Sequence, residues 1–230
     1  MPSFWSYIGN EEYNVGCTGQ TVYVYNKAGK ELAKFKDIKY AYHPVISPDG
    51  DTLVVKSTEG RLAVYSLSEL CLKKKFRFSK VDGAQDDNCC FSPDGKEFFN
   101  IERHVDSLKT ALSVYDTADF SLKRRILQDN FDMVINHIEC DAETQAYFLL
   151  GYFRDPVYGV ADKFFVAKLR DDRLEDIAYI PSEQHWYYLG FLDLKDMGFT
   201  KKAKQWSECN DLDGIELKNH SLKELWDNTI

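Results

Sequence analysis

The sequence predicts an all-β protein built from a repeated unit of four strands, and three observations support this. Runs of four to eight residues rich in Val, Tyr, Phe, Ile and Thr recur between clusters of Asp, Gly, Ser, Asn and Lys. Apolar residues at helical spacing are missing until the last part of the chain. The tetrapeptide Ser-Pro-Asp-Gly occurs at residues 47–50 and again at 92–95, each time before a strand-like run. A period of 45 residues in a β-rich chain indicates an array of one supersecondary unit.

The first two units are predicted from alternating residues and from the first turn tetrapeptide. Unit one spans about residues 3–38, and its clearest strand is the alternating run at 21–25. Unit two spans about residues 39–80. Its strands are predicted at 44–46, 52–56, 61–65 and 72–78.

Units three and four repeat the same order of strands. Unit three spans about residues 83–128, with strands predicted at 88–91, 97–101, 111–115 and 122–127. Unit four spans about residues 131–181, with strands predicted at 134–140, 145–153, 163–169 and 174–180. In unit four the segment Asp141-Ala142-Glu143-Thr144 replaces the turn tetrapeptide, and a longer loop at 154–162 separates the second and third strands.

A fifth unit is predicted over about residues 184–230. Its first strand is expected at 186–193, after which the pattern becomes polar. The segment Ser221-Leu222-Lys223-Glu224 has the form of a capping box, which predicts a short carboxy-terminal helix.

These motifs resemble the repeats of WD40-like β-propellers, over roughly residues 3–180. In that family the Ser-Pro-Asp-Gly turn links the first two strands of a blade, and an aromatic-Asp pair ends the third. Tyr115-Asp116 matches this pair, whereas Tyr25-Asn26 and Tyr65-Ser66 match only in the aromatic residue. No Trp-Asp pair ends a predicted third strand, since the one such pair in the chain, Trp226-Asp227, lies in the carboxy-terminal capping-box segment. No Gly-His pair precedes a first strand either, so the hydrogen-bonded tetrad of true WD40 blades is not expected.

The resemblance implies a β-propeller of four-stranded blades in a single domain over residues 1–230. Five blades of about 46 residues fit the 230-residue chain and would close a ring. An open half-ring completed by dimerisation is the structural alternative. We therefore expect a monomer or a homodimer.

Charge and composition exclude several classes of partner. The net charge is -8, from 29 Lys and Arg against 37 Asp and Glu, which argues against nucleic acid and anionic membranes as partners.

The amino terminus lacks the charged and apolar regions of a secretory signal, and the longest nearly apolar run, 146–153, is too short to span a bilayer. The six cysteines form no Cys-x-x-Cys pair, so we expect free thiols in a cytoplasmic protein. They are Cys17, Cys71, Cys89, Cys90, Cys140 and Cys209.

No residue pattern points to catalysis, a cofactor or a metal ion. The five histidines have no metal-ligand spacing, and no serine lies in a Gly-x-Ser-x-Gly elbow. They are His43, His104, His137, His185 and His220. Asp49, Asp94 and Asp141 fall at the turns, where we interpret them as turn-forming residues rather than as a catalytic carboxylate pair.

Basic clusters recur in the predicted fourth strand of the units. They comprise Lys34 and Lys36, residues 73–75 with Arg77, and residues 123–125, and unit four interrupts the series with Glu175-Asp176. Charge on an outer strand prevents edge-to-edge pairing, so we interpret these clusters as edge protection rather than as a nucleic-acid surface. The aromatic set Trp186, Tyr187, Tyr188 and Phe191 is interpreted as blade packing rather than as a stacking platform for a sugar or base.

The sequence thus favours a non-enzymatic propeller that acts as a scaffold and binds a protein or peptide through its rim. The alternative is a small propeller enzyme, similar to a glycoside hydrolase, with converging carboxylates at the central channel. We also expect Tyr25, Tyr65 and Tyr115 to be equivalent third-strand residues packed between blades.

Overall fold

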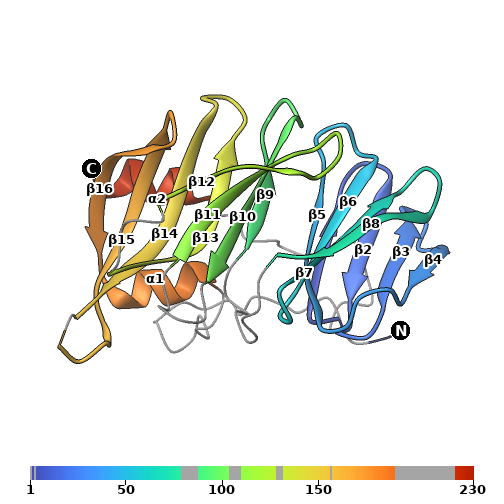
Figure 1. Cartoon of the computed structure of the whole chain (residues 1–230), viewed down its shortest axis with the longest axis horizontal. Helices are drawn as coiled ribbons and strands as arrows, with labels where there is room; N and C mark the ends of the chain where they lie inside the picture. Colours follow the sequence, from blue (N-terminus) through green and yellow to red (C-terminus); the bar gives the residue numbers. More distant parts are fainter. Residues whose placement is uncertain are drawn as a thin grey trace.

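The computed structural model describes residues 2, 4–78, 88–103, 110–127, 132–155, 157–189 and 221–230. Within these residues the chain forms four antiparallel sheets of four strands each (Figure 1). In every sheet the strands lie in sequence order, so each sheet is a simple meander. The predicted all-β class and the four-stranded unit are confirmed.

The strands of the first two sheets lie where the repeat predicts them. The first sheet comprises β1 (Ser6–Gly9), β2 (Tyr13–Cys17), β3 (Val22–Asn26) and β4 (Glu31–Phe35). The second comprises β5 (Ala41–Ile46), β6 (Thr52–Ser57), β7 (Arg61–Ser66) and β8 (Cys71–Arg77).

The third and fourth sheets also follow the predicted order, and the fourth has longer strands. The third sheet comprises β9 (Cys89–Phe91), β10 (Glu97–Arg103), β11 (Thr110–Asp116) and β12 (Leu122–Ile126). The fourth comprises β13 (Met133–Asp141), β14 (Ala146–Arg154), β15 (Ala161–Arg170) and β16 (Arg173–Ile180).

The two Ser-Pro-Asp-Gly turns have the same hydrogen bonds. The amide of Gly50 donates to the carbonyl of Ser47 at 2.9 Å, and the Ser47 hydroxyl donates to Asp49 at 2.5 Å. In the second turn the Ser92 hydroxyl donates to Asp94 at 2.7 Å. Both glycines have positive φ, at 83° for Gly50, which a residue with a Cβ atom adopts only under strain. Asp49 and Asp94 are therefore turn-forming residues, as predicted.

One irregularity in strand pairing recurs in all four sheets and shows that the units are equivalent. The register between the third and fourth strands shifts at Val24/Tyr25, at Val64/Tyr65 and at Val114/Tyr115. In the fourth sheet the shift falls at Lys168/Leu169. Such a bulge is a conserved element of a repeat, because it re-aims the residues beside it.

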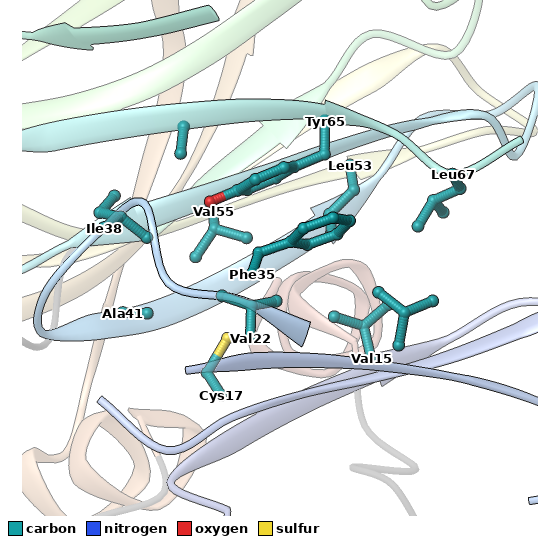
Figure 2. Close-up of a cluster of buried hydrophobic side chains, with 12 residues drawn as sticks. Val15, Cys17, Val22, Phe35, Ile38, Ala41, Leu53, Val55, Tyr65 and Leu67 are labelled. Atoms are coloured by element: carbon teal, nitrogen blue, oxygen red, sulfur yellow. The ribbon is translucent and has the colours of Figure 1, made fainter. Parts of the chain in front are cut away.

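The third-strand tyrosines pack toward the preceding blade. Tyr65 is fully buried and stacks on Phe35 of the first sheet, with ring centroids 4.2 Å apart (Figure 2). Tyr115 contacts Phe76 of the second sheet at 5.5 Å. Tyr25 of the first sheet instead meets the ring of Phe4 edge-on at 6.4 Å. The three tyrosines are buried and equivalent, as predicted, and only two of them lie between blades.

The four sheets follow one another along the longest axis of the molecule, with the first and fourth at opposite ends (Figure 1). Residues 184–230, predicted as a fifth unit, lie mainly outside the described residues. Where they are described they are helical, in α1 (Ser182–Leu189) and α2 (Leu222–Thr229). Neither of these helices has the length and apolar composition needed to cross a membrane.

The strand predicted at 186–193 is wrong for residues 186–189, which belong to α1. His185 and Tyr188, three residues apart, both pack against the fourth sheet, where the ring of Phe164 lies 4.8 Å from that of His185. This spacing matches the period of a helix and not the period of a strand. Residues 190–193 lie outside the described part of the chain.

The carboxy-terminal helix predicted from the capping box is confirmed. The amide of Glu224 donates to the Ser221 hydroxyl at 3.2 Å. Leu222, Leu225 and Trp226 pack with Phe148 on the fourth sheet. Leu149, the next residue of β14, points to the other face and packs in the core shared with the third sheet. Helix α2 therefore covers the face of the fourth sheet on which a following blade would pack.

Candidate protein-interaction surfaces

The basic fourth strands lie at the outer edges of their sheets, as predicted, and their cations also join neighbouring blades. Lys74 of β8 donates to the carbonyls of Asp119 and Phe120 in the turn before β12. Arg124 of β12 binds Asp172 in the turn before β16. These contacts were not predicted from the sequence, because a charged edge residue shows no sign of its partner in the next unit.

Arg124 holds two carboxylates from different blades. Its guanidinium donates to both oxygens of Glu97, at 2.7 and 3.0 Å, and to both oxygens of Asp172, at 2.5 and 3.0 Å. The ammonium of Lys123 lies 2.9 Å from Glu97. A groove of about 440 Å³ between the third and fourth sheets is lined by Glu97, Arg124 and Asp172 together with Tyr147 and other residues.

This pair of carboxylates is not suited to glycoside hydrolysis. Such an enzyme needs one carboxylic acid whose pKa is raised so that it can donate a proton. Here hydrogen bonds from Arg124 and Lys123 lower the pKa of Glu97 below its ordinary value. Glu97, the first residue of β10, is therefore an ionised anchor that Arg124 joins to Asp172 of the next blade, and neither carboxylate lies on the first strands β9 and β13.

A second polar cluster lies just before the first strand β9, on the first strand β13 and beside α2. Asn88 contacts the His137 ring at 3.2 Å, and His137 contacts Glu139 at 3.0 Å. The other oxygen of Glu139 accepts the amide of Leu222, the first residue of α2, at 2.7 Å. A carboxylate at a helix amino terminus is stabilised by the exposed amides and the helix dipole, so Glu139 anchors α2.

The described histidines and carboxylates form no metal site. No group of three or more His, Cys, Asp and Glu side chains in the described ranges could hold a metal ion. His185 of α1 lies 3.2 Å from the amide oxygen of Asn136 and is fully buried. His104 and His220 lie outside the described residues.

Charged residues are also buried between the second and third sheets. Lys56 is 3% exposed and donates to the carbonyl of Ile101 at 2.6 Å. Glu102 accepts hydrogen bonds from Tyr115 at 2.6 Å and from Asn100 at 3.2 Å. Both groups have the partners that burial requires. The sequence signal for Lys56 is a charge two residues after the apolar Val54, and Glu102 has no such signal because it follows the polar Asn100.

Three strongly exposed apolar side chains lie together at the tip of the β14–β15 hairpin. Val157, Tyr158 and Val160, called the hairpin tip below, are 78%, 79% and 59% exposed. The hairpin projects beyond α1 at the lower left of Figure 1. The predicted loop at 154–162 is confirmed in position, although its apolar exposure was not anticipated.

The turn that carries the hairpin tip is ordered by Asp155. Its side chain accepts the amides of Val157 and Tyr158 at 2.8 and 2.7 Å. Its backbone amide donates to the carbonyl of Val160 at 2.8 Å, and its carbonyl accepts the amide of Gly159 at 2.8 Å. Gly159 has a φ of 67°, a value suited to glycine. The apolar side chains are thus presented by a hydrogen-bonded turn.

The cysteines and the carboxy-terminal aromatics follow the predictions as far as the structure describes them. Five cysteines are free, and Cys209 lies outside the described residues. Burial raises the pKa of Cys17 and of Cys89 to about 12. Tyr188 packs against the fourth sheet. The side chains of Trp186, Tyr187 and Phe191 are outside the described part of the chain.

Comparison with known proteins identifies the fold. No family model and no curated protein sequence matches the chain. Among solved structures, Kuenenia stuttgartiensis hydrazine synthase is similar with a TM-score of 0.60 and 15% identity, covering 74% of this chain and 51% of that one. The WD40 domain of Toxoplasma gondii coronin is similar with a TM-score of 0.59 and 16% identity, covering 77% and 45%. The chain spans about half the length of these proteins, and it has a WD40-like β-propeller fold.

Proposed function

We propose that this WD40-like propeller is a non-enzymatic scaffold that binds a protein or peptide partner through the hairpin tip of its fourth blade. The single observation that supports this most strongly is the exposure of Val157, Tyr158 and Val160 on one ordered turn. Exposed apolar side chains that cluster, rather than lie singly, are typical of interaction sites. The free thiols of the described cysteines support a reducing compartment such as the cytoplasm.

The form of the tip indicates the form of its partner. A projecting turn is convex, so the complementary surface is a concave apolar pocket. Tyr158 is the central contact in this proposal, because tyrosine supplies a large rigid ring with only two torsions to immobilise. Because Asp155 already orders the turn, little conformational entropy remains to be lost on binding.

The proposal is tested by quantitative affinity capture with the full chain and two variants. The test variant combines Val157→Ser and Tyr158→Ser. The control variant is Ile230→Ser, which changes an apolar residue that is 80% exposed and lies at the carboxy-terminal end of α2, away from the hairpin tip. We expect that one protein is captured by the parent chain and by the control variant but not by the test variant. Titration of the purified partner should show roughly 30-fold weaker binding, the effect of losing a central contact worth about 2 kcal/mol. A partner bound equally by all three chains would place the site elsewhere and refute the proposal.

A further inference from the structure

The outer edges of the sheets are not equally protected. Strand β8 contains three consecutive lysines, and β12 contains Lys-Arg-Arg. Strand β16 has the sequence RLEDIAYI, and its last four residues carry no charge. Natural proteins place lysines on an exposed edge to prevent pairing with another strand, so β16 lacks the protection that β8 and β12 have.

The unprotected half of β16 also exposes its largest side chains. Ile177 is 37% exposed and Tyr179 is 59% exposed. They are paired with Ala167 and Phe165 of β15, so both lie on the face directed toward the third sheet. Strand β16 is the last strand of its sheet, and within the described residues no backbone group is paired with its outer side. In Figure 1 this strand forms the left-hand end of the row of sheets.

We propose that the outer edge of β16 pairs antiparallel with β16 of a second copy of this chain, joining two fourth sheets into one continuous sheet. The charge pattern of the strand selects this occupant. A parallel copy in register would place Glu175 against Glu175 and Asp176 against Asp176. An antiparallel copy brings the acidic half of each strand to the apolar half of the other.

The same charges select one register. A two-fold axis perpendicular to the sheet keeps every side chain on its own face, so the pairing is centred on a residue. Centring on Glu175 or Asp176 would bring like charges directly opposite, which is destabilising. Centring on Ile177 pairs Ile177 with its copy, Glu175 with Tyr179, and Asp176 with Ala178. This is the longest pairing within β16 that avoids opposed acids.

The register centred on Ile177 predicts different oligomeric states for lysine substitutions at Ile177 and Tyr179, although both side chains lie on the same face of β16. Ile177→Lys places two ammonium groups opposite each other and should convert the dimer to a monomer. Tyr179→Lys places its ammonium group opposite Glu175 and should keep the dimer. Leu122→Lys, at an exposed position of the outer strand β12, is the matched control and should also keep it.

The experiment measures molar mass by light scattering over a dilution series, with circular dichroism to verify that each variant is folded. A second readout is a disulfide between copies of the Ile177→Cys variant. Residues directly opposite in an antiparallel pair have Cα atoms about 4.5–5.5 Å apart, which suits a disulfide. We expect a reducible dimer for Ile177→Cys and none for Leu122→Cys.

Three results would overturn the inference. The first is a parent that is monomeric at every concentration. The second is a dimer that persists in a folded Ile177→Lys variant, because its interface must then lie elsewhere. The third is a monomeric chain whose β16 edge captures an extended peptide from another protein. None of these bears on the hairpin tip, so failure here and failure of the proposed function are distinguishable.

Discussion

Replacing Tyr65 with alanine tests whether third-strand tyrosines hold neighbouring blades together. The side chain is fully buried and its ring stacks on Phe35 of the first sheet at 4.2 Å. Burying a tyrosine removes about 150–250 Å² from water. At about 25 cal/mol per Å² this corresponds to roughly 4–6 kcal/mol as an upper value. The Cβ atom of alanine retains a small part of this buried area, so we expect Tyr65→Ala to lower the free energy of unfolding by about 3–5 kcal/mol.

The assay is urea unfolding followed by circular dichroism and by intrinsic fluorescence. Tyr158→Ala is the control, because it removes the same atoms from a side chain that is 79% exposed, and it should change the free energy of unfolding by less than about 0.5 kcal/mol. A loss below about 1 kcal/mol for Tyr65→Ala would show that the ring is not a principal contact between the first two blades.

Three further predictions concern charge and thiols. Hydrogen bonds from Arg124 lower the pKa of Glu97 below its ordinary value of 4.5, so its ion pairs stabilise the fold above that pH and are lost as the pH falls through the lowered pKa. Glu97→Gln should therefore be less stable than the parent at neutral pH, with the difference in unfolding free energy disappearing in acid. Replacing residues 73–75 with threonine should increase aggregation measured by light scattering, while the parent shows no salt-sensitive DNA or RNA binding in a low-salt titration. Mass spectrometry of unreduced, denatured protein should show alkylation of all six cysteines, whereas Cys17 and Cys89 in the native protein should react slowly because their pKa values are about 12.

Local signals predicted the blades well, because the strands are defined by patterns that repeat. The turn at Ser47 and its copy at Ser92 each set the start of a second strand, and their hydrogen bonds are local. The pair Val64-Tyr65 marked a register shift that recurs in every sheet. The capping box at Ser221 depends on two residues three positions apart. In all these cases the determining interaction lies within a few residues in the sequence.

The features that the sequence did not reveal depend on contacts between units. Arg124 binds Asp172, 48 residues later, and nothing in its own strand distinguishes it from a solvated edge cation. The strand predicted at 186–193 is helical over residues 186–189, because packing of His185 against the fourth sheet overrides the high β-propensity of the aromatic residues there. The exposure of Tyr158 could not be predicted, since a tyrosine in a loop is as easily buried as exposed.

The departures from the repeat are concentrated in the fourth blade. Its strands have 8 to 10 residues, whereas the other blades have strands of 3 to 7. It lacks the basic outer strand and, like the first blade, the turn tetrapeptide, and among the described residues it carries the apolar hairpin tip and the packed helix α2. In a repeat array each unit contacts mainly its neighbours, so one unit can change without disturbing those farther along. Positions where a sequence breaks its own rules are expected at functional sites. In both proposals the first three blades would serve as the rigid support, and the fourth would present the hairpin tip and the outer edge of β16.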